Sequence, residues 1–218
     1  RLAAKWQTRR FARAGRIRNA GMGKAEHTRA VLLRAAANVI GRHGFTAATV
    51  DKIAEEAGVS KGNLYYHFKT KADIATHVLT GGMQRLSADL RTAVEKSENG
   101  LDALHRMIGM FARAVFSSPE LARFMLTELW RNDRIWSDAM HKQEEECILI
   151  IQQQIERGRA EGLIRAEVDA RFAAVAMVGT VLTCTQYYLM ESQTAPLDER
   201  CQQFEQHVVD YISHALSA

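Results

Sequence analysis

The twenty residues from Thr49 to Phe68 constrain the fold more than any other segment of the chain. The small side chain of Ala54 suits a close crossing of two short helices, and Gly58 permits the positive-φ turn that ends the first of them. Ser60 is a favourable N-cap for the second helix. A miniature core between the helices is supplied by Ile53, Ala57, Val59 and Leu64. This pattern predicts a helix-turn-helix unit.

The rest of the chain is also suited to helices. Only two prolines occur, while Ala, Leu, Glu, Arg and Gln are abundant. Apolar residues recur at helical spacing, and Gly44 is the expected end of the first helix. We therefore predict an all-α fold of about nine helices, with an N-terminal three-helix helix-turn-helix domain and a C-terminal helical domain. The predicted helices cover about residues 24–42, 50–57, 61–67, 70–99, 101–116, 133–161, 169–192 and 196–216, with a further helix starting at Pro119.

Charge is distributed unevenly along the chain. Residues 1–21 carry seven Lys or Arg and no acid, residues 22–77 have a balance of +3, and residues 78–218 have a balance of −6. A basic front and an acidic back favour a polyanionic partner at the front.

Three parts are predicted: a basic N-terminal extension (1–23), a helix-turn-helix DNA-binding domain (24–70) and a helical effector-binding and dimerisation domain (71–218). The extension has two equally favoured interpretations, an arm that orders on DNA or a segment upstream of a biological start at Met22. An organellar targeting peptide is a less favoured third interpretation.

The helix at about Lys61–His67 is the one expected to enter the major groove of DNA. Lys61 can donate to guanine O6 and N7, and Asn63 can bond base edges or phosphate. Gly62 lets the backbone approach the duplex, and Tyr65 can touch a thymine methyl or a phosphate. These residue types predict direct contact with bases.

Residues around this helix are better suited to the DNA backbone. His67 and Lys71 are expected to contact phosphate. Two alternatives stay open, because Tyr66 could pack partly against the first helix and His67 could cap local backbone. A helical hairpin without any ligand is the less favoured alternative to DNA binding.

The same segment closely resembles the signature of the tetracycline-repressor (TetR) family. Residues 49–71 read Thr-Val-Asp-Lys-Ile-Ala-Glu-Glu-Ala-Gly-Val-Ser-Lys-Gly-Asn-Leu-Tyr-Tyr-His-Phe-Lys-Thr-Lys. The resemblance spans about residues 28–79, and beyond them it covers architecture only. It implies a homodimeric transcriptional regulator, usually a repressor, that releases a palindromic operator when a small molecule binds. By position, the DNA-facing residues of the family match Thr49, Lys61, Gly62, Asn63, Tyr65, Tyr66, His67 and Lys71. The basic front departs from the pattern, since many members start closer to the first helix.

The last two helices, near 169–192 and 196–216, are predicted to form the homodimer interface. A stripe of small residues in the first of them would allow close approach, namely Ala173, Ala176, Thr180 and Thr183. We expect Val175, Val178, Leu182 and Tyr188 to face inward. The last helix offers an apolar set of Phe204, Val208, Tyr211, Ile212 and Ala215. Two such helices per subunit would make a four-helix interface, as the resemblance also implies, although packing within one subunit is the alternative.

Methionine and aromatic residues in the back half predict an adaptable apolar pocket for the effector. The candidate lining residues are Met107, Met110, Phe111, Phe124, Met125, Trp130, Met140, Met177 and Tyr187. For each of them, ordinary core packing is the favoured alternative. A polar contact could come from His105, Arg106, Arg113, Arg123 or Gln186, and nothing selects one.

Other functional classes find little support. No H-E-x-x-H, G-x-S-x-G or P-loop motif occurs, so we predict neither an enzyme nor a cofactor. Three widely spaced cysteines fit a reducing, cytoplasmic interior better than disulfides or a zinc site. A metal shared by His141 and Glu145 is disfavoured against a solvated face. Residues 172–190 lack a formal charge, but their Gly, Thr and Gln favour a buried helix over a membrane span.

We therefore expect a ligand-responsive DNA-binding transcriptional regulator, most readily a repressor that a small hydrophobic effector releases from its operator. The alternative is an architectural DNA-binding protein without an effector, which would show little sequence preference. The sequence leaves open the effector, the operator and whether the protein represses or activates.

Overall fold

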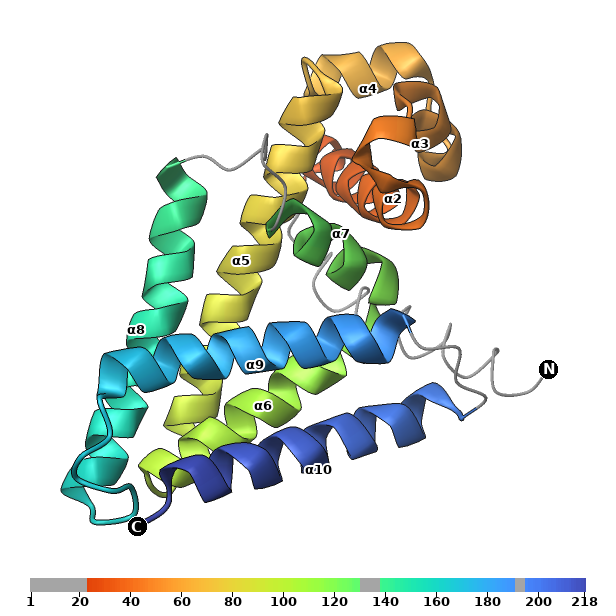
Figure 1. The fold of residues 1–218 in the computed structure, drawn as a ribbon. Coiled ribbons are helices and arrows are strands. Elements are labelled where there is room, and N and C mark those ends of the chain that lie inside the picture. Colours follow the sequence, from red (N-terminus) through yellow and green to blue (C-terminus); the bar gives the residue numbers. More distant parts are fainter. Residues whose placement is uncertain (1–22, 130–137, 191–194) are drawn as a thin grey trace.

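The computed structural model describes residues 23–129, 138–190 and 195–218, so the predictions for the basic extension lie outside the described residues. These ranges contain nine helices and no strand (Figure 1). In chain order the helices are α2 (Lys24–Ala47), α3 (Val50–Ala57), α4 (Lys61–His67), α5 (Lys71–Glu95), α6 (Gly100–Ser117), α7 (Pro119–Leu129), α8 (Asp138–Ala160), α9 (Ala170–Met190) and α10 (Leu197–Leu216). The predicted all-α fold is confirmed.

The helix-turn-helix forms at the predicted residues because its local signals agree. The Thr49 hydroxyl accepts a hydrogen bond from the Lys52 amide at 3.2 Å and starts α3. Gly58 ends that helix with a φ of 68°, which a side chain would strain. The Ser60 hydroxyl then accepts from the Asn63 amide at 3.2 Å and starts α4.

Two helix ends differ from the prediction. The first helix continues to Ala47, but Gly44 interrupts it with a φ of 76° and a ψ of 159°, so the backbone turns at the residue expected to end it. The helix α5 ends at Glu95 instead of near residue 99. Asn99 is extended, and its side chain accepts from the Asp102 amide at 2.8 Å, which makes it the cap of α6.

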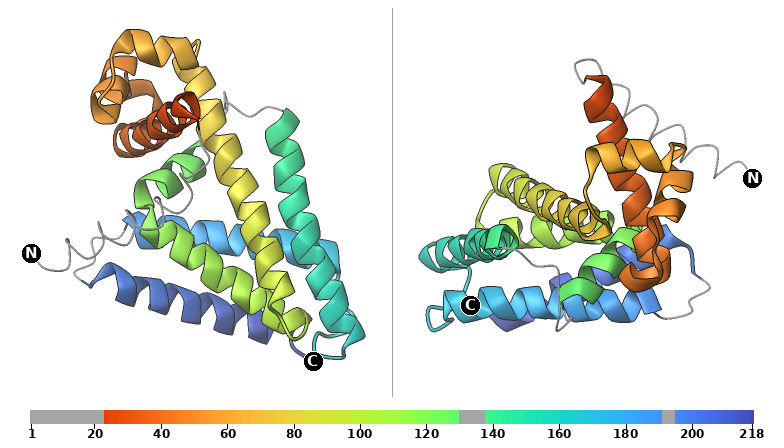
Figure 2. Two further views of the ribbon diagram at one scale, coloured as in Figure 1. Left: turned by 180° about the vertical axis from the view of Figure 1, so that it is seen from behind. Right: turned by 90° about the horizontal axis from the view of Figure 1, so that it is seen from above.

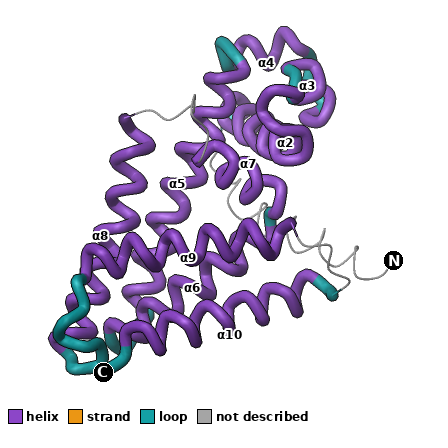
Figure 3. The backbone as a smooth tube through the Cα atoms, viewed as in Figure 1, coloured by secondary structure: helices purple, strands orange, loops and turns teal. Residues whose placement is uncertain are grey.

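The helix α5 connects two hydrophobic cores. The small core lies under α2, α3 and α4, and it includes Ile74 and Val78 from α5 and Phe124 from α7. The larger core lies among α5, α6, α8, α9 and α10. Figure 2 shows α5 running from the unit formed by α2, α3 and α4 to the region between α6 and α8, with α9 and α10 on one side of the molecule. Figure 3 shows that the described loops are short connections at helix ends.

Candidate functional site

The exposed face of α4 is the candidate nucleic-acid interface. Leu64 is fully buried and anchors the helix in the small core, while Lys61, Gly62, Asn63 and Tyr65 are exposed. Tyr66 is 84% exposed, which excludes packing against α2. The structure therefore places the residues expected to touch bases on a surface that a duplex can reach. Thr49 is exposed beside it, and His67 is half-buried.

The ammonium of Lys61 is held by a carboxylate of α3. Its Nζ lies 2.9 Å from a carboxylate oxygen of Asp51, and the hydrogen bond to this carboxylate raises the pKa of Lys61. Both side chains are more than half exposed. To reach a guanine, Lys61 must leave Asp51 or share its three donors with it.

Lys71 has partners that the sequence does not predict. Its Nζ donates to the carbonyl oxygens of Phe45 at 2.7 Å, Ala48 at 2.9 Å and Thr46 at 3.3 Å. It also lies 4.4 Å from the centroid of the Phe45 ring. These contacts tie the start of α5 to the end of α2, so the ammonium of Lys71 is already engaged where a free phosphate contact was expected.

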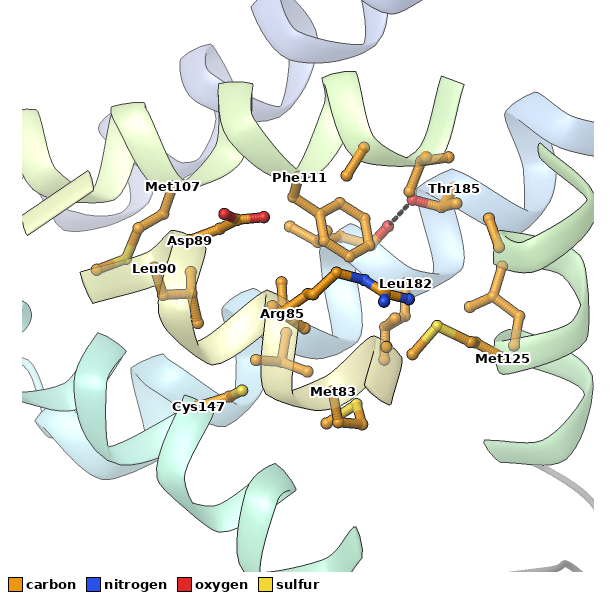
Figure 4. Close-up of a pocket in the computed structure, with 18 of the residues that line it drawn as sticks. Met83, Arg85, Asp89, Leu90, Met107, Phe111, Met125, Cys147, Leu182 and Thr185 are labelled. Atoms are coloured by element: carbon orange, nitrogen blue, oxygen red, sulfur yellow. Dashed lines mark hydrogen bonds between the residues drawn. The ribbon is translucent and has the colours of Figure 1, made fainter. Parts of the chain in front are cut away.

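An apolar cavity of about 340 Å³ lies between α5, α6, α7, α8 and α9 (Figure 4). Four of the predicted lining residues are in its wall, namely Met107, Phe111, Met125 and Met177. Other predicted residues lie elsewhere: Met110 packs against the larger core, Phe124 belongs to the small core, and Tyr187 is 62% exposed. Trp130 and the side chain of Met140 lie outside the described residues.

Sequence reasoning missed the contribution of α5. The cavity wall includes an apolar stripe of this helix formed by Leu79, Gly82, Met83, Leu86 and Leu90, with Arg85 and Asp89 beside it. The spacing of this stripe is helical and was a usable signal. The stripe lies on the same helix that carries Ile74 and Val78 in the small core.

The polar residues expected at the pocket have other partners. Two of them form ion pairs, Arg106 with Asp102 at 2.7 Å and Arg113 with Glu205 at 3.3 Å. The other two form hydrogen bonds, Arg123 with the Leu189 carbonyl at 3.1 Å and His105 with the Ser213 hydroxyl at 2.8 Å. Gln186 is exposed on α9. Thr185 lines the cavity, and its hydroxyl donates to the Val181 carbonyl at 2.7 Å.

Cys147 is part of the cavity wall as well as of the core. Burial raises the pKa of its thiol to about 12. The thiol therefore stays neutral at physiological pH and acts as a small apolar group, since oxidation proceeds through the thiolate.

The helix α7 joins the cavity to the DNA-binding end. Met125 lines the cavity, while the neighbouring Phe124 is buried in the small core. At its first turn α7 packs against Gly41 of α2 so closely that a Cβ on Gly41 would meet the Glu120 carbonyl. A displacement of α7 by a bound molecule would therefore reach α2 directly.

One face of α9 is apolar and exposed, with Phe172 74%, Val175 47% and Tyr187 62% exposed. The prediction that Val175 faces inward is wrong, because it shares this face with Ala176 and Thr183, while Val178 and Leu182 line the cavity. By length and composition this helix could span a membrane. Its other face packs in the larger core against α8 and α10.

The apolar set predicted on the last helix is divided between two sides. One stripe of α10 packs along α6 and is buried within the subunit; it is formed by Phe204, Val208 and Ile212. The ring centroids of Phe204 and Phe116 lie 5.8 Å apart. The assignment of this stripe to a subunit interface is therefore wrong. Tyr211 and Ala215 are exposed.

Known proteins resemble this chain along most of its length. The family model for bacterial regulatory proteins of the tetR family matches residues 32–78, and the model for the tetracyclin repressor-like C-terminal domain matches residues 101–212. The HTH-type transcriptional repressor KstR2 of Mycobacterium tuberculosis is 35% identical over 89 residues, which cover 41% of this chain and 43% of that protein.

Two solved structures share the fold. The fatty acid degradation regulator FadR of Bacillus halodurans has a TM-score of 0.74 at 21% identity and covers 86% of this chain and 96% of its own. FadR of Bacillus subtilis in complex with stearoyl-CoA has a TM-score of 0.71 at 22% identity, with 82% of this chain and 96% of its own covered. Together with the two family models, the helix-turn-helix and the helical back half place this chain in the tetR family of bacterial regulatory proteins, which regulate transcription by binding DNA.

Proposed function

We propose that this protein is a dimeric repressor whose α4 helices bind a palindromic operator and which an apolar small molecule releases from DNA. The observation that carries the proposal is the position of α5, which supplies Ile74 and Val78 to the small core and Met83, Leu86 and Leu90 to the cavity wall. Interactions in the cavity and at the DNA thus act on one rigid helix.

The mechanism is a shift between two arrangements of α5 and α7. A molecule that fills the cavity contacts both helices, at Met83 and at Met125. Since α4 leads through Phe68 and Thr70 directly into α5, moving α5 moves the recognition helix. An effector and an operator that prefer different arrangements oppose each other's binding to the same extent.

The effector is proposed to be largely hydrophobic, because Leu, Ile, Val, Met and Phe dominate the cavity wall. A volume of about 340 Å³ lies at the small end of the range of roughly 300–1,000 Å³ for ligand sites. The relative solved with stearoyl-CoA gives independent support for an apolar effector.

The dimer is proposed to form through α9 and the exposed side of α10. Burying Phe172, Val175 and Tyr187 against a second copy would remove apolar surface from water and explain why α9 is apolar nearly all round. Tyr211 of α10 adds to the same interface. A two-fold dimer presents two copies of α4 to two half-sites, in the cytoplasm where bacterial DNA lies.

The test begins with selection of binding duplexes from a random DNA library and measurement of affinity by fluorescence anisotropy. The expected result is a palindromic sequence bound at least 10³-fold more tightly than unrelated DNA at physiological salt. Nearly equal affinities for the selected sequence and for unrelated DNA, both falling steeply with salt concentration, would instead support the architectural alternative. Apolar compounds are then titrated into the complex, and a bound compound that leaves operator affinity unchanged would refute the release mechanism.

A further inference from the structure

One cationic side chain lies in the mostly apolar wall of the cavity. Among the described residues that line it, Arg85 is the only Lys or Arg. No hydrogen bond or ion pair connects its guanidinium to another described residue, whereas Arg91, six residues further along α5, pairs with Glu146 at 2.6 Å. Arg85 therefore has its full set of donors available for a ligand.

The Arg85 side chain extends along α5 toward the N-terminal end of this helix. Its Nη1 lies 3.9 Å from the position that a Cβ on Gly81 would take. Asp89 follows about one turn later, and in Figure 4 its carboxylate lies toward Met107, whereas the Arg85 guanidinium lies toward Leu182. The guanidinium therefore marks one end of the cavity, near Gly82 and the Met125 sulfur of α7, which lies 3.2 Å from the Cβ position of Gly82.

The remainder of the cavity continues away from this charge. Along α5 the whole cavity wall extends from Leu79 to Leu90, about 16 Å at the helical rise, and the part from Gly81 to Leu90 corresponds to about 14 Å of it. Its far end is formed by Met107, Cys147 and Ile151, all buried. Thr185, which Figure 4 shows on the opposite side from Met107 and Cys147, already donates its hydroxyl to the Val181 carbonyl.

From these contacts we infer that the effector is an elongated anionic amphiphile whose acidic head binds Arg85 and whose apolar chain fills the cavity toward Met107 and Cys147. This inference rests on the proposed function for its cavity and deepens it by naming the charge of the ligand. Asp89 and Glu144, which also line the cavity, repel an anion from other positions and so orient the head toward Arg85. The anion can be a carboxylate or a phosphate, because a guanidinium binds both in the same bidentate geometry.

The experiment compares ligands that share a sixteen-carbon chain and differ in their head. Palmitate, palmitoyl-CoA, 1-hexadecanol and hexadecyltrimethylammonium are titrated against the fluorescent probe N-phenyl-1-naphthylamine bound to the full-length protein, each below its micelle concentration or, for the alcohol, its solubility limit. Wild type is expected to bind an anionic ligand about fivefold or more tightly than the alcohol, with the cation weakest. Preference for palmitate assigns the carboxylate, preference for palmitoyl-CoA alone assigns the phosphates, and coenzyme A without a chain serves as the control for the head.

Variants connect the preference to Arg85. Arg85→Gln should bring anion and alcohol affinities within about twofold while leaving alcohol binding unchanged, and Arg85→Lys should retain most of the preference. Arg91→Gln is the matched control on the same helix and should behave like wild type. Equal or tighter binding of the alcohol or the cation to wild type, an anion preference that survives Arg85→Gln, or no displacement by any of the four would overturn the inference. If palmitate binds with this preference but leaves the operator bound, the proposed function fails while the ligand assignment stands.

Discussion

The ammonium of Lys71 donates to the Phe45 carbonyl at 2.7 Å and lies 4.4 Å from the centroid of the same residue's ring, so one side chain fastens α5 to the end of α2. Because Lys71 is half-buried, these contacts are partly shielded from water. The family resemblance also places this lysine among the DNA-facing residues. A role in folding stability and a role in DNA binding can be separated by experiment.

Replacing this lysine tests which role dominates. Lys71→Met should lower the free energy of unfolding by about 2 kcal/mol, since charged hydrogen bonds to three carbonyls are lost. Urea denaturation followed by circular dichroism measures the loss. Lys69→Met, at an exposed position two residues earlier, is the control and should change stability by less than about 0.5 kcal/mol. Unchanged stability with weakened binding to every duplex would make Lys71 a phosphate contact instead.

Lys61→Ala tests base recognition by α4. If Lys61 donates to guanine, the variant should lose about 1–3 kcal/mol on the selected operator and relax the preference at one base pair per half-site. Affinity is measured by anisotropy on the operator and on single-base variants. The exposed Lys52 on α3 provides the matched control, Lys52→Ala. An equal loss on all sequences would reassign Lys61 to phosphate.

Gly41→Ala tests the close contact between α2 and α7. A Cβ at this position would lie 2.1 Å from the Glu120 carbonyl oxygen, which is backbone and cannot rotate away. We expect a loss of about 1–3 kcal/mol from the forced displacement, seen as a lower Tm. Gly81→Ala is the control within a helix, because its nearest contact would be 3.9 Å away. An equal Tm for both variants would show that α2 and α7 separate without cost.

His105 predicts a dependence of stability on pH. Burial lowers the pKa of this imidazole below its ordinary value of 6.5, so the unfolded chain binds the proton more readily than the folded one. The contribution of the neutral imidazole to the free energy of unfolding is therefore complete above pH 6.5. It is lost as the pH falls through the pKa of His105 in the folded protein, which is lower. Between pH 7 and pH 5, wild type should lose more Tm than His105→Gln, with the exposed His43→Gln as control. Parallel curves for wild type and His105→Gln would contradict this assignment.

Phe172→Glu tests the proposed dimer. Phe172 is 74% exposed in the single chain, and a charge there would be buried without a partner in a two-fold interface. Sedimentation velocity should show a monomer that keeps its helical content. Leu149→Glu places the same charge on an exposed position of α8 and should leave the dimer intact. A dimeric Phe172→Glu variant would move the interface away from this end of α9.

The helices and the DNA-binding unit follow from local sequence. The Thr49 and Ser60 caps and the turn at Gly58 act within a few residues, so α3 and α4 begin and end where the sequence predicts. Such short-range signals do not depend on the rest of the chain. For the same reason Asn99, a strong cap at the start of α6, could have been recognised as the start of that helix.

Tertiary packing decided which residues share a site. Met107, Met125 and Met177 reach the cavity, yet Phe124 turns to the small core because α7 lies between two cores and one step along a helix rotates a side chain by about 100°. The contacts of Lys71 with Phe45 and the position of Arg85 depend on how α5 crosses its neighbours. Periodicity tells which residues share a helix face, but the partner of each face is set only when all the helices pack together.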